Sequence, residues 1–175
     1  MSAQTLPTAP HPPTDPAPAR LPRPGTYTAG DRCIIELTTR LGPLVTMRCR
    51  LTADEAALTV APSASDTVLS LKLTGVALGG DELTFVSTAV EPKPEADDAR
   101  LRIPGALATG DPTASSIPAT LTLRVVDRTD DSLLVLGTVQ VPYGHLRRAT
   151  GLVLSRIRPA DRLRLLVAAE FTCPA

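Results

Sequence analysis

Apolar residues occupy every second position of the stretch IPATLTLRVV (117–126), namely Ile117, Ala119, Leu121, Leu123 and Val125. Successive side chains of a β-strand point to opposite faces, so this alternation predicts a strand with one apolar face and one face toward water. A chain built from such segments must bring its apolar faces together, and this requirement limits the fold more than any other feature of the sequence.

Seven further stretches are candidate strands. They are CIIELTT (33–39), VTMRCRL (45–51), TVLSLKLTGVAL (67–78), ELTFVSTAV (82–90), ARLRI (99–103), LLVLGTVQV (133–141) and RLRLLVAAEFT (162–172). Turn segments such as GGDE (79–82) and TGDPTASS (109–116) separate them. About eight strands at short, regular spacing predict an all-β protein, either a sandwich or a barrel.

One segment has no clear period. ATGLVLSRI (149–157) fits either a short helix or another strand. Thr150 and Gly151 are poor helix formers, so we do not expect a long helix there.

The totals exclude several function classes. The 175 residues suit one domain, and 18 basic side chains balance 18 acidic ones, so no net charge argues for a nucleic acid or an anionic membrane. Two histidines and the separated Cys33, Cys49 and Cys173 offer no spacing for a zinc or Ser-His-Asp site. We therefore expect reduced cysteines, no metal, no cofactor and no enzyme activity, with an enzyme acting on a lipid-like substrate as a distant alternative.

The first 24 residues hold eight of the 18 prolines and few large apolar side chains. This composition predicts a disordered, partly extended tail (1–24) before a barrel domain (25–175). The alternative for the tail is a ligand for a proline-reading domain. The tail lacks the basic start and apolar middle of a secretory signal, and no run of about 18 apolar residues occurs, so we expect a cytoplasmic protein without stable membrane insertion.

The order of the segments resembles the YceI-like family. GTYTAGDRCIIELTTRLGPLVTMRCRL (25–51) is similar to its first two strands, which begin with Gly-Thr-aromatic and Asp, reach a strand-ending Arg, and resume as Val-Arg-Gly-Arg-Phe. LTFVSTAVEP (83–92), RIPGALATG (102–110), IPATLTLRV (117–125) and RPADRLRLLVAAEF (158–171) resemble later strands in the same order. Leu41 stands where the family usually has His, Cys49 where it has Gly, and its Arg near an aromatic-Gly pair has no clear counterpart beside Tyr143.

The resemblance implies an eight-stranded antiparallel, lipocalin-like barrel. It also implies a binder, not an enzyme, that sequesters or transports a long-chain apolar or amphiphilic lipid, isoprenoid-like in kind, inside the barrel. The residues by themselves leave open a ligand-free barrel that serves as an interaction module. A homodimer is a further partner that the sequence does not exclude.

Alternation assigns a set of apolar side chains to the barrel interior, where they are candidate ligand-binding residues. They are Ile35, Leu37, Met47, Leu69, Leu71, Leu73, Leu83, Phe85, Leu121, Leu123, Leu136, Leu165, Val167 and Phe171. Burying one such side chain contributes about 1.5–3 kcal/mol, which favours a filled core. Two Phe, two Tyr and no Trp leave fewer large rings to fill the interior, which favours a ligand tunnel.

Arginines are the candidate contacts to a polar head group. Arg40 matches the strand-ending arginine of the family, and Arg147 and Arg148 belong to six arginines within 145–164, where Asp161 is the single acidic residue. Guanidinium groups pair with oxyanions through two parallel hydrogen bonds, so such residues suit a phosphate or phenolic head group. The other interpretation is a solvated outer face.

Two further functions of the charged residues, nucleic-acid binding and calcium binding, are disfavoured. Nucleic-acid binding is less expected because aromatic stacking residues are nearly absent. The acidic stretches EPKPEADD (91–98) and DRTDD (127–131) lack the glycine of a calcium loop, so we interpret them as solvated turns.

Overall fold

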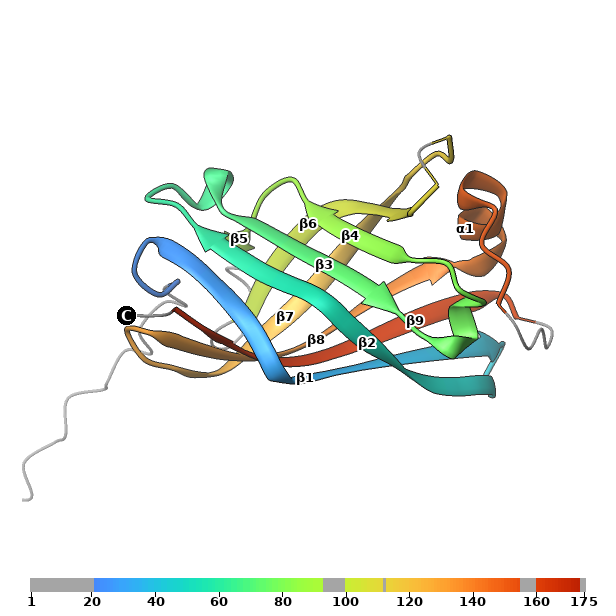
Figure 1. Ribbon diagram of the computed structural model, residues 1–175, viewed down its shortest axis with the longest axis horizontal. Helices are drawn as coiled ribbons and strands as arrows, with labels where there is room; N and C mark the ends of the chain where they lie inside the picture. Colours follow the sequence, from blue (N-terminus) through green and yellow to red (C-terminus); the bar gives the residue numbers. More distant parts are fainter. Residues whose placement is uncertain (1–20, 93–99, 112, 155–159, 174–175) are drawn as a thin grey trace, which may run out of the picture.

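The computed structural model describes residues 21–92, 100–111, 113–154 and 160–173, and the structural statements below concern these residues. Eight antiparallel strands form a closed barrel in which most neighbours in the sheet are also neighbours in the chain (Figure 1). The strands are β1 (Gly25–Leu41), β2 (Leu44–Val60), β3 (Val68–Thr74), β4 (Leu83–Ser87), β6 (Arg100–Thr109), β7 (Ile117–Arg128), β8 (Ser132–Pro142) and β9 (Arg162–Thr172). The predicted eight-stranded antiparallel barrel is therefore confirmed.

Two pairings between strands that are not consecutive in the chain complete the barrel. β1 pairs with β9, from Thr28 opposite Thr172 to Arg40 opposite Arg162. β4 pairs with β6, while the two-residue strand β5 (Glu91–Pro92) lies against the far end of β6. Because the sheet closes on itself, the barrel wall has few unpaired edges.

The inward faces of the strands form one apolar core, as the alternation predicts. Twelve of the fourteen side chains predicted to face inward are buried, Met47 is half-buried and Leu136 is exposed. β7 shows the pattern most clearly, because its residues from Ile117 to Arg124 are alternately buried and exposed.

The inward placement of Leu136 is wrong. The inward residues of β8 are Leu133, Val135, Gly137, Val139 and Val141. Leu136 faces outward and is 43% exposed. The apolar run LLVL obscured the period. The inward position next to Leu136 is a glycine, Gly137, and a Cβ atom there would lie 2.2 Å from Leu123 Cδ2.

A short helix closes one end of the barrel. α1 (Tyr143–Thr150) directly follows β8, and it buries Tyr143, Leu146 and Thr150 against the core. The helix ends at Gly151, whose left-handed φ of 72° lets its N–H donate to the carbonyl of Arg147 at 2.9 Å. The short 3-10 turn η2 (Val76–Leu78) lies at the same end and buries Ala77 and Leu78.

The helix lies earlier in the chain than the segment 149–157 that the sequence marks. Of that segment, residues 151–154 have no regular structure and 155–157 lie outside the described residues. Among the described helices, none combines the length and the apolar character needed to cross a membrane.

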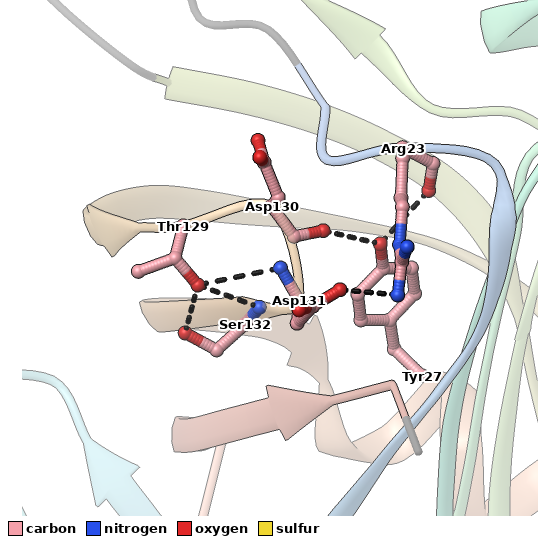
Figure 2. Close-up of polar contacts among 6 residues, drawn as sticks. All are labelled: Arg23, Tyr27, Thr129, Asp130, Asp131 and Ser132. Carbon is pink, nitrogen blue, oxygen red and sulfur yellow. Dashed lines mark hydrogen bonds and ion pairs between the residues drawn. The ribbon is translucent and has the colours of Figure 1, made fainter. Parts of the chain in front are cut away.

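Tyr27 and the chain before β1 cover the opposite end (Figure 2). Leu21 packs against the core and Pro22 is buried, so the described end of the predicted tail contacts the barrel. Residues 1–20 of the predicted tail lie outside the described residues. Asp131, at the turn between β7 and β8, forms an ion pair with Arg23 (Figure 2).

Candidate functional site

The predicted ligand-binding residues meet in a packed core. A side chain beside an internal hollow keeps accessible surface whenever a water molecule fits into that hollow. Leu37 and Leu73 have none, and Phe85 and Phe171 are 1% exposed. In this structure the side chains of the barrel centre therefore contact one another, and their role as ligand contacts stays a prediction.

The barrel wall opens where β1 and β2 stop pairing. Their register holds as far as Thr28 opposite Ala57 and resumes at Ile35 opposite Leu51, so six residues of β1 (29–34) stand against five of β2 (52–56). The pairing of β1 with β9 is also shifted between Ala29 and Cys33. This double irregularity is a bulge that loosens the wall on both sides of β1.

A cavity of about 450 Å³ lies at this place, and we refer to it as the β1–β2 opening. It is lined by Ala29, Asp31, Cys33, Leu51, Thr52, Ala53 and Asp54. Leu51 is buried and Ala29, Cys33 and Ala53 are half-buried, whereas both aspartates are exposed. The opening thus has an apolar wall toward the core and an acidic rim toward solvent.

The rim and the thiol define what the opening can do chemically. The carboxylate of Asp54 accepts a hydrogen bond from Thr74 Oγ1 at 3.1 Å. Burial raises the pKa of the Cys33 thiol above its ordinary value, so Cys33 is protonated near neutral pH and is a weak nucleophile. Among the described residues, no cluster of His, Cys, Asp or Glu could hold a metal ion. The geometry suits non-covalent binding.

The structure places the three predicted head-group arginines on two elements. Arg147 and Arg148 are exposed on α1. Arg40 is half-buried near the end of β1, directly opposite Arg162 of β9. Arg156 and Arg158, from the same basic stretch, lie outside the described residues.

Sequence reasoning missed the residues of the β1–β2 opening. Gly30 and Asp31 interrupt the alternating pattern of β1 in the sequence TAGDRC. Glycine and aspartate are depleted in strands, and a glycine inside a strand often marks a bulge. That interruption was the available signal, although it does not specify which part of β2 lies opposite.

Part of β2 has a partner on one side only. Residues 44–51 of β2 pair with β1, and the pairing with β3 begins at Thr52. Val45 and Met47 lie on one face of this segment, and the exposed Arg48 and Arg50 lie on the other. Among the described residues, no second strand covers this edge.

Comparisons with known proteins add no family to these observations. No model of a known protein family matches the chain, and no curated protein matches it.

Proposed function

We propose that the barrel binds an amphiphilic, lipid-like ligand through the β1–β2 opening. The observation that carries the proposal is the cavity of about 450 Å³ at the interrupted pairing of β1 and β2. Its volume lies within the range of roughly 300–1,000 Å³ that is typical of small-molecule sites, whereas its exposed lining is more polar than apolar. The resemblance to YceI-like proteins supports the same class of ligand.

The two parts of the opening suit the two parts of such a ligand. Its apolar chain would lie against Leu51 and Ala53, where each methylene removed from water contributes about 0.8 kcal/mol. Its head group would lie beside Asp31 and Asp54, so a neutral hydrogen-bond donor or a cation is preferred and an anion is repelled. A chain longer than the opening must displace core side chains, because the barrel centre is packed.

The test uses N-phenyl-1-naphthylamine, an uncharged apolar probe whose fluorescence rises on burial. Ala53→Phe fills the opening, and we expect it to weaken probe binding about tenfold or more. Ala57→Phe adds the same ring to the same strand and serves as the control, because Ala57 does not line the opening. Equal binding by both folded variants would refute the proposal. Melting curves of both variants, and native mass spectrometry for a ligand carried from the host, complete the test.

A second candidate function is self-association, favoured by the packed core and the unpaired edge of β2. An antiparallel pairing of two copies, centred on Met47, would place Val45 of one copy opposite Cys49 of the other. The same register places Arg48 opposite Thr46, so no two arginines face each other. Unpaired strand edges are templates for such pairing.

Sedimentation of Met47→Lys tests this second candidate. The variant sets two like charges opposite each other at the centre of the pairing, and we expect it to be a monomer. Thr122→Lys, an exposed change on β7, should leave the dimer intact. A wild-type chain that is monomeric at about 100 μM would contradict self-association. Interfaces of standard size bind at micromolar concentrations or below, so a dimer would be populated under these conditions.

A further inference from the structure

Three arginines gather on the outer face of β1 and β9, at the barrel end that α1 closes. Arg40 is directly opposite Arg162, and Arg164 is opposite Thr38 on the same two strands. Leu163 between them is fully buried, so Arg162 and Arg164 point away from the core. We name Arg40, Arg162 and Arg164 the outer arginine cluster.

Within the part of the chain that the structure describes, the charges of this cluster have no ion-pair partner. Side chains directly opposite across two strands have Cβ atoms about 4.5–5.5 Å apart, so Arg40 and Arg162 repel each other. Among the described residues, no acidic side chain forms an ion pair with any of the three. Of the neighbouring carboxylates, Asp161 accepts a hydrogen bond from the Gly42 N–H at 3.1 Å, and Glu36 forms an ion pair with Arg48 at 3.2 Å.

One polar atom of the cluster lacks a partner altogether. Arg40 Nε is buried and forms no hydrogen bond. Leaving a buried N–H donor unsatisfied costs free energy, and native structures contain few such groups. An unsatisfied guanidinium donor next to two further guanidinium groups favours an acceptor with negative charge, which can reach the buried Nε only after the Arg40 side chain shifts.

The surface beside the cluster has room for such an acceptor. A hollow of about 220 Å³ is lined by Gln140, Val141, Pro142 and Arg162. Gln140 is directly opposite Arg164, and Pro142 is directly opposite Arg162, so the hollow adjoins the cluster on the β8 side. The amide of Gln140 adds a neutral hydrogen-bond donor to the positive groups.

We propose that the outer arginine cluster is a binding site for a phosphate-type oxyanion. Guanidinium groups donate paired hydrogen bonds that match the oxygens of phosphate. The ligand chemistry is that of a free phosphate or of a phosphorylated lipid head group. The site is independent of the β1–β2 opening, whose acidic rim repels the same anion.

The experiment titrates inorganic phosphate into the full chain at low salt and follows binding by calorimetry and by the melting temperature. Arg162→Gln and Arg164→Gln should each weaken phosphate binding about tenfold, as expected when one charge-assisted contact is lost. Arg40→Lys keeps the charge but removes the Nε donor, and a weakening there separates hydrogen bonding from net charge. Arg124→Gln on β7 is the control, because it removes the same charge from an exposed position outside the cluster.

A second arm identifies the source of the phosphate. Vesicles of phosphatidylcholine with 20% phosphatidic acid are compared with pure phosphatidylcholine in a flotation assay. Retention on the acidic vesicles alone, lost in Arg162→Gln, supports a lipid head group; binding of inorganic phosphate without vesicle retention supports a free phosphate. The proposal is overturned if Arg124→Gln weakens phosphate or vesicle binding as much as Arg162→Gln does. It is also overturned if the wild-type chain binds neither phosphate nor vesicles. Binding of an oligonucleotide alone also overturns it.

Discussion

The hydroxyl of Tyr27 lies 3.1 Å from the backbone carbonyl of Asp130, 103 residues further along the chain, and donates a hydrogen bond to it (Figure 2). The carbonyl of Arg23 lies 2.9 Å from the same hydroxyl, so the two carbonyls share its single proton. The Tyr27 side chain is fully buried. One side chain of β1 thus connects the segment before the barrel with the turn between β7 and β8.

Removing this hydroxyl should destabilise the barrel. We expect Tyr27→Phe to lower the free energy of unfolding by about 1–2 kcal/mol, because two backbone carbonyls lose a buried donor. Asp131→Asn is the control, since it removes only the solvent-exposed ion pair with Arg23 and should cost less than about 0.5 kcal/mol. Urea unfolding measures both variants. A Tyr27→Phe variant as stable as Asp131→Asn would show that the hydroxyl bonds contribute little.

The same tyrosine makes stability depend on alkaline pH. Burial, the largest cause, raises the pKa of Tyr27 above its ordinary value of 10.0. Between the unfolded and folded pKa values the folded chain holds a proton that the unfolded chain has lost, so the free energy of unfolding falls as pH rises above 10. The stability of Tyr27→Phe should fall less over this range. Parallel curves for the two chains between pH 9 and about 11, which spans the ordinary tyrosine pKa, would contradict this assignment.

Two leucines on neighbouring strands should respond in opposite ways to a charge. Leu123 is 3% exposed and faces the core, whereas Leu136 is 43% exposed and faces outward. Leu123→Glu should prevent folding or lower the melting temperature severely, because a buried carboxylate has no partner there. Leu136→Glu should change the free energy of unfolding by less than about 0.5 kcal/mol. Circular dichroism melts compare the variants, and a severe loss in Leu136→Glu would contradict the observed register of β8.

Two glycines form a matched pair for an added methyl group. A Cβ at Gly137 would lie 2.2 Å from Leu123 Cδ2 and 2.7 Å from the Thr122 carbonyl oxygen, so Gly137→Ala should cost about 1–3 kcal/mol. A Cβ at Gly144, inside α1, meets nothing within 4 Å. Gly144→Ala should therefore be neutral or stabilising by up to about 1 kcal/mol, because alanine is the better helix former. Thermal unfolding measures the stability of both variants. Equal changes in Gly137→Ala and Gly144→Ala would contradict the close approach of Leu123 to Gly137.

Alternation predicted the strands because residues on one face of a strand are two positions apart in the sequence. It was sufficient for β7, whose polar and apolar residues separate cleanly. It failed at Leu136, where leucines and valines occupy both faces and the inward position next to it is a glycine. Glycine has no side chain that would mark position 137 as inward, and the Leu123 side chain that occupies this space belongs to the neighbouring strand.

The candidate sites were harder to predict than the fold. The β1–β2 opening depends on which residues of β2 face a bulge in β1, and that register is a tertiary property. Arg162 and Arg164 were visible as outward residues of a strand, but their nearness to Arg40 follows from the closure of the barrel. Tyr143, Leu146 and Thr150 have helical spacing, yet the short segment YGHLRRAT contains few other apolar residues to reveal it.

The pairing of β1 with β9 has a consequence for the order of folding. Thr28 lies opposite Thr172, so this seam joins parts of the chain that are the last to meet by diffusion. During synthesis on the ribosome, β1 cannot pair with β9 until almost every other strand has emerged. Nascent chains would then expose that flank for much of translation, and a chaperone that shields extended segments would act at this stage.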